Sequence, residues 1–134
     1  GNSFLCLPCT NEIRISIKYG PEHTKLTPAF FDKFLISENN RLEMAESTIR
    51  QQIPSNLEPE IEILNNTYEK MFGIQVLAFH AVVYLENYVL RDTTYMGIHK
   101  NRIFRVTLNY IDGDMDEVAA ITLDKFFSSL RFNG

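Results

Sequence analysis

The sequence predicts an α+β domain in which helices sandwich an antiparallel β-sheet. Three observations support this prediction: several segments alternate apolar and polar residues, other segments carry apolar residues at helical spacing, and 134 residues suit one domain. Apolar residues make up 45% of the chain and charged residues 22%, which are ordinary values for a folded globular protein. We therefore expect residues 11–134 to form a single α/β domain, preceded by a tail over residues 1–10.

The tail contains the pair Cys6-Leu7-Pro8-Cys9. A redox-active C-x-x-C pair normally lies at the N-terminus of a helix, where the dipole stabilises a thiolate, but this pair precedes a strand-like segment. Two thiols supply at most half of a zinc site, and no histidine lies nearby in the sequence to complete it. We predict either a small structural disulfide between Cys6 and Cys9 or two unreactive thiols. Gly1, in the place of a Met, is interpreted as the remnant of a cleaved tag, so that a natural leader could have been removed upstream.

The first element of the domain is predicted to be a strand over residues 12–19. Isoleucines alternate there with Arg, Ser and Lys, which is the pattern of a half-buried strand. Gly20-Pro21 is expected to end it, because proline has no backbone N–H to donate to a neighbouring strand.

Two helices are predicted next. Thr27-Pro28 combines a favoured N-cap residue with proline at the first helical position, and it predicts a short helix over residues 29–36. Residues 37–53 carry apolar side chains at three- and four-residue spacing, which predicts a longer amphipathic helix. Pro54 ends this pattern, since the residue before a proline avoids the helical conformation.

Strand patterns dominate the rest of the domain up to residue 110. Residues 60–64 alternate Glu and Ile, and residues 73–85 are apolar on both faces, as in a central strand. Residues 87–98 and 102–110 flank the short turn His99-Lys100-Asn101 and predict a hairpin.

An acidic cluster follows the last predicted strand. Asp112, Asp114 and Asp116 match the first three ligand positions of a calcium-binding EF loop, but Glu117 stands where that loop needs Gly and Leu123 where it needs Glu. The stretch from Asp114 to Glu117 instead has the form of a helix capping box, and the helix dipole favours acidic groups in the first turn. We therefore predict the start of a C-terminal helix and no bound metal.

No motif for catalysis or for a cofactor is present. His23, His80 and His99 lie far apart, in a predicted loop, strand and turn, and the chain lacks a Gly-rich phosphate loop, a zinc-protease motif and a nucleophile elbow. We expect no enzymatic activity and no cofactor. The net charge of −4 argues against nucleic-acid binding, and no apolar stretch reaches the ~20 residues that span a bilayer.

Polar residues recur at every second position on several of the predicted strands. One interpretation is a solvated sheet face with cross-strand ion pairs. The other is a docking surface for a protein partner, because Arg is enriched at interface hot spots. The residues of this predicted sheet face are Glu60, Glu62, Arg91, Thr93, Arg105, Thr107 and Asn109.

The order of elements (strand, helix, four strands, then a C-terminal helix ending in Phe-Phe-Ser-Ser-Leu-Arg-Phe, residues 126–132) resembles the PsbP-like fold. That fold is an α/β/α sandwich, found in photosystem extrinsic proteins, in a nuclear-transport Ran-binding protein and in small bacterial exported proteins. Residues 72–84, a long strand that contains a Gly near its start, and residues 128–132 are similar to segments of that group. The resemblance spans residues 12–132 and concerns the fold, since no motif for photosystem or Ran binding is present.

The resemblance implies a non-catalytic domain that binds a protein partner in the periplasm or otherwise outside the cytoplasm. Some bacterial members are similar to immunity proteins, which neutralise a toxin, and scaffolding of a partner is a related role. Two alternatives stay open from the sequence. A carrier of a small ligand or lipid should have a large apolar pocket, and an enzyme should have clustered titratable groups with perturbed pKa values.

Overall fold

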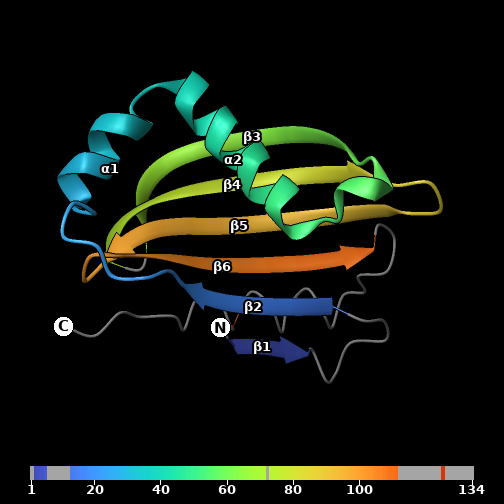
Figure 1. The fold of residues 1–134 in the computed structure, drawn as a ribbon, viewed down its shortest axis with the longest axis horizontal. Coiled ribbons are helices and arrows are strands. Elements are labelled where there is room, and N and C mark those ends of the chain that lie inside the picture. Colours follow the sequence, from blue (N-terminus) through green and yellow to red (C-terminus); the bar gives the residue numbers. More distant parts are fainter. Residues whose placement is uncertain (1, 6–12, 72, 112–124, 126–134) are drawn as a thin grey trace.

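The computed structural model describes residues 2–5, 13–71, 73–111 and 125 (Figure 1). The predicted Cys6–Cys9 disulfide, the acidic cluster from Asp112 to Glu117 and the predicted C-terminal helix lie outside these residues. The described elements are, in chain order, β1 (Asn2–Leu5), β2 (Ile13–Tyr19), α1 (Pro28–Leu35), α2 (Glu38–Gln52), a short 3-10 helix η1 (Ser55–Leu57), β3 (Glu60–Met71), β4 (Ile74–Tyr84), β5 (Val89–His99) and β6 (Arg102–Ile111).

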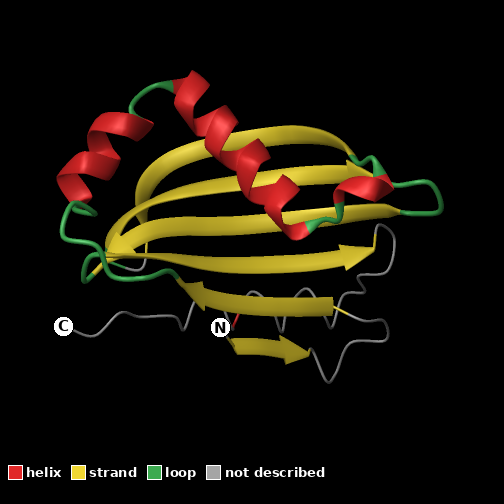
Figure 2. Cartoon of the chain, in the orientation of Figure 1, coloured by secondary structure: helices red, strands yellow, loops and turns green. Residues whose placement is uncertain are grey.

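The strands form one antiparallel sheet in the order β1-β2-β6-β5-β4-β3, with α1 and α2 on one of its faces (Figure 2). After β2 the chain crosses this face through the two helices and reaches β3 at the opposite edge. Strands β3 to β6 then follow one another as a meander, which returns the chain to β2. The prediction of an α+β domain with helices packed on an antiparallel sheet is confirmed. The prediction of a helix on the second face concerns residues outside the described ones.

Both helices begin within one residue of the predicted position. The Thr27 hydroxyl accepts a hydrogen bond from the Phe30 N–H at 3.2 Å, and the Ser37 hydroxyl accepts one from the Asn40 N–H at 3.4 Å. These side chains satisfy backbone donors that the first turn of a helix leaves without partners. Ile53, the residue before Pro54, is extended and ends α2.

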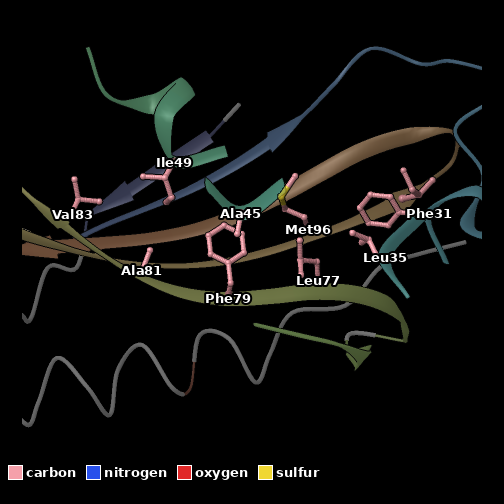
Figure 3. Packing of buried hydrophobic residues seen from close by; sticks show 10 residues of the cluster. Phe31, Leu35, Ala45, Ile49, Leu77, Phe79, Ala81, Val83 and Met96 are labelled. Atoms are coloured by element: carbon pink, nitrogen blue, oxygen red, sulfur yellow. The ribbon is translucent and has the colours of Figure 1, made fainter. Parts of the chain in front are cut away.

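The main core lies between the helices and the sheet. Figure 3 shows the side chains of β4 pointing toward those of α1 and α2. Because adjacent strand residues point to opposite faces, β4 also contributes Val76 to a second buried cluster on the other face, with Phe104 and Val106 of β6. The prediction that β4 is apolar on both faces is thus confirmed. The buried members of the main core are Phe31, Leu35, Ala45, Ile49, Leu77, Phe79, Ala81, Val83, Met96 and Ile98.

The N-terminal tail requires a correction. Residues 1–10 were expected to lie outside the domain, but Asn2–Leu5 pair with β2 as an edge strand, from Asn2 opposite Ile17 to Leu5 opposite Arg14. A strand of four residues is too short to show alternation in the sequence. Its formation depends on the free edge that β2 offers, which is a tertiary feature.

Candidate functional site

Helix α2 crosses in front of β3, β4 and β5, whereas β6 and β2 lie to one side of it (Figure 1). Two neighbouring hollows are lined by α2 and by residues of β2, β5 and β6, with volumes of about 360 and 640 Å³. Gln52 of α2 lines the first hollow and Gln51 lines the second, so the two adjoin along the helix. We refer to them together as the α2 groove.

Asp92 of β5 lies in the first hollow, near the C-terminal end of α2. It is only 3% exposed, and its carboxylate accepts hydrogen bonds from the Thr94 hydroxyl at 2.6 Å and the Asn109 amide at 2.5 Å. Burial raises the pKa of Asp92 to about 6, although the two hydrogen bonds and the attraction of Arg105 act in the opposite direction. The rest of the lining is Arg14, Ile49, Gln52, Ile53, Val83, Tyr88, Leu90, Asn109, Tyr110 and Ile111.

The hydrogen bonds continue along the sheet from Asp92. The Thr94 hydroxyl lies 3.3 Å from that of Thr107 on β6, and both threonines are buried. Because hydrogen bonds satisfy both oxygens of the buried Asp92 carboxylate, this network forms a rigid polar floor in the first hollow. This arrangement is a structural feature of the groove, and by itself it does not nominate a reaction.

The second hollow is basic on the sheet side and apolar beneath. Lys18 of β2 and Arg105 of β6 line it, and Glu43 and Ser47 of α2 stand on the helix side. Burial lowers the pKa of the Arg105 guanidinium, and the nearby Asp92 carboxylate opposes this shift. Four side chains supply the apolar part of the lining: Phe34, Met44, Met96 and Ile103.

The predicted sheet face does not exist as a single surface. Thr107 pairs with Thr94 and Asn109 pairs with Asp92, so Arg105, Thr107 and Asn109 point to the helix side, toward the α2 groove. Arg91 and Thr93 lie at the intervening positions of β5 and point to the other side of the sheet. The prediction of one shared face is therefore wrong, because the relative phase of two strands is set by their pairing register.

The other side of the sheet carries the remaining predicted residues. Glu60 pairs with Tyr84, whose hydroxyl donates to the Glu62 carboxylate at 3.1 Å. The Thr93 hydroxyl lies 2.7 Å from Nδ1 of His80, an exposed residue whose pKa is lowered by partial desolvation. These contacts are those of partly solvated polar side chains, whereas Val76, Phe104 and Val106 on the same side of the sheet are buried. A role for this face in partner binding stays a prediction.

Sequence reasoning missed Arg14, Lys18 and Asp92 as residues of one hollowed surface. The alternation of β2 placed Arg14 and Lys18 on its polar side, but nothing in that strand shows that β6 lies beside it. Asp92 could have been singled out from the sequence. A carboxylate inside a strand is disfavoured unless hydrogen-bond partners surround it, so its presence in β5 indicates a local polar network.

The described part of the chain contains no group of three or more His, Cys, Asp or Glu residues placed to hold a metal ion. Among its helices, none is long and apolar enough to cross a membrane.

Comparison with known proteins adds evidence on the fold alone. No protein-family model matches the chain, and no curated protein matches its sequence. Among solved structures, the chain is similar to a protein of unknown function from Pseudomonas aeruginosa, described as a candidate regulator. The TM-score is 0.69 at 12% sequence identity, and the match covers 99% of this chain and 83% of the other. At this identity the two share a fold, and neither a function nor a site is transferred.

Proposed function

We propose that this chain is a non-catalytic protein-binding domain and that the α2 groove receives its partner. The observation that carries the proposal is the composition of the groove: an open surface between a helix and the sheet, with a polar floor in the first hollow and, in the second, basic side chains beside an apolar floor. Protein interfaces combine buried apolar contacts with polar groups that orient the partner.

The packing of the helices favours this function over a carrier. A carrier of a lipid or small apolar ligand needs a large apolar cavity between helices and sheet. Between α1, α2 and β4 that space is filled by buried side chains, among them Leu35 and Phe79. The two hollows of the α2 groove lie beside this packed region and are open surface features, not an enclosed cavity.

The surroundings of Asp92 favour this function over an enzyme. Among the described residues that line the first hollow there is no histidine, and the hydrogen bonds of Asp92 come from a threonine and an asparagine. A general acid or base needs open access to a reacting group and a partner that positions it. Asp92 is instead enclosed by side chains that hold the sheet together.

A photo-crosslinking residue at Ser47 tests the groove directly. Ser47 is exposed and lines the second hollow, whereas its neighbour Glu46 is exposed and pairs with Arg50 along the helix. Irradiation in the source cell should link a protein to the chain from position 47 and none from position 46. Equal crosslinking from both positions, or a link only from Thr93 on the other face, would place the partner elsewhere.

A location outside the cytoplasm forms part of the same proposal. It is supported by the close pair Cys6 and Cys9 and by the resemblance to exported PsbP-like proteins, of which the immunity-protein type suits a small acidic domain. Fractionation of the source cell, with blotting for the chain, tests it. Recovery in the cytoplasmic fraction alone would contradict it.

A further inference from the structure

Two cations lie side by side on the sheet wall of the second hollow. Lys18 of β2 and Arg105 of β6 are directly opposite in the antiparallel register, and both line this hollow. Like charges in directly opposed positions of a sheet destabilise it. The repulsion between Lys18 and Arg105 therefore destabilises the folded chain when no anion lies between them.

The described residues compensate these cations only in part. Neither the Lys18 ammonium nor the Arg105 guanidinium makes an ion pair or a side-chain hydrogen bond in the part of the chain that the structure describes. Arg105 is attracted by Asp92, while Glu43 stands on the helix wall of the same hollow. The exposed Lys18 and the half-buried Arg105 thus leave a basic site that an added carboxylate would complement.

The surface beside this basic site suits apolar side chains. Met44 of α2 and Met96 of β5 line the hollow together with Phe34 and Ile103. Methionine side chains adapt to irregular partners because they are unbranched and polarisable. The hollow therefore offers a basic wall and a deformable apolar floor side by side.

We propose that the α2 groove receives an acidic segment of a protein partner. One carboxylate of the segment lies between Lys18 and Arg105, and its apolar side chains pack on the methionine floor. This inference rests on the proposed function and adds to it the chemistry of the partner. Charge complementarity carries it, since the chain as a whole has a net charge of −4 and the groove wall is locally basic.

Synthetic peptides provide the test. A short fluorescent peptide of Leu, Ala and Glu, with the Leu residues on one helical face, is compared with matched peptides in which Gln or Lys replaces Glu. Fluorescence anisotropy at low ionic strength, where surface charges are least screened, measures the dissociation constants. The Glu peptide should bind about tenfold more tightly than the Gln peptide, and the Lys peptide least tightly.

Variants of the chain then locate the contact. Lys18→Glu should weaken binding of the Glu peptide about five- to tenfold, whereas Lys70→Glu, the same change on the exposed edge strand β3, should leave it unchanged. Arg105→Gln should weaken binding and Arg105→Lys should largely preserve it. Glu43→Gln removes the acidic group of the groove wall and should tighten binding severalfold, a gain that a damaged fold cannot produce.

The outcomes separate this inference from the proposed function. If the Glu and Gln peptides bind equally, or if Lys18→Glu and Lys70→Glu act alike, the acidic partner is excluded. Crosslinking from position 47 would still support a protein-binding groove in that case. If the Lys peptide binds best, the inference is overturned and Glu43 becomes the recognition group.

Discussion

Neighbouring residues of this chain differ sharply in what they contribute to stability. Leu35, the last residue of α1, is fully buried in the main core, whereas Ile36, next to it, is 81% exposed. Leu35→Ala should therefore lower the free energy of unfolding by about 2–5 kcal/mol, because it opens a cavity in a packed core. Ile36→Ala should change it by less than about 0.5 kcal/mol. Urea denaturation of both variants measures the contrast, and equal effects would contradict the placement of α1.

Asp92 makes the stability of the fold depend on pH. The pKa of this carboxyl rises from an ordinary value of 3.8 to about 6 in the folded chain, chiefly through burial. Between these values the folded state binds more protons than the unfolded state, so the contribution of Asp92 to stability falls as pH rises through this window. Between about pH 4 and pH 7.5 the loss amounts to about 2 kcal/mol.

Asp92→Asn tests this assignment. The variant has no titrating group at this position, so its free energy of unfolding should decline less between about pH 4 and pH 7.5 than that of the wild type. Denaturant titrations of both proteins across this range give the difference. Parallel pH profiles would show that Asp92 titrates normally.

At the scale of elements, the β5–β6 hairpin depends on a glycine. Gly97 is paired with Phe104, and a Cβ atom at position 97 would lie 2.7 Å from a ring carbon of Phe104 and 3.1 Å from the Gln75 carbonyl oxygen. Gly97→Ala should therefore destabilise the domain by about 1–3 kcal/mol through overpacking. The second replacement Phe104→Leu should recover part of this loss, while Gly20→Ala, where the nearest atom is 3.6 Å away, serves as the control. Additive effects at positions 97 and 104 in thermal or urea unfolding would contradict the contact.

The elements that local chemistry defines were predictable from the sequence. The caps Thr27 and Ser37 and the breaker Pro54 act on their immediate neighbours, so the helix boundaries agree with the prediction. Strand β3 continues to Met71, well beyond the predicted residues 60–64, because a bulge at Leu64 shifts the register and interrupts the alternation.

The candidate site was harder to predict from the sequence than the helices and strands were. Each strand showed which of its residues alternate, but the phase between β5 and β6 depends on the turn at Lys100 and Asn101, both of which have positive φ. The groove needs, in addition, the pairing of β2 with β6 and the path of α2 across the sheet. These are long-range features, and no local pattern encodes them.

At the scale of the whole molecule, the two buried clusters share β4. Leu77 and Phe79 pack toward the helices, while Val76 belongs to the cluster on the other face. A strand common to both clusters should make the domain unfold as one cooperative unit. We expect far-UV circular dichroism and tyrosine fluorescence to give coincident urea transitions, in the wild type and in Leu35→Ala. Separate midpoints for the two probes would show that the clusters unfold independently.

The pairing of β2 with β6 also has a consequence for folding during synthesis. Lys18 leaves the ribosome long before Arg105, its partner across the sheet. Until β6 has emerged, β2 and β5 both present an unpaired edge on which other chains could form strands. The basic site consists of Lys18 of β2 and Arg105 of β6, so it forms only when β6 pairs with β2. If the groove receives an acidic segment as proposed, a nascent chain becomes able to bind it only once β6 has completed the sheet.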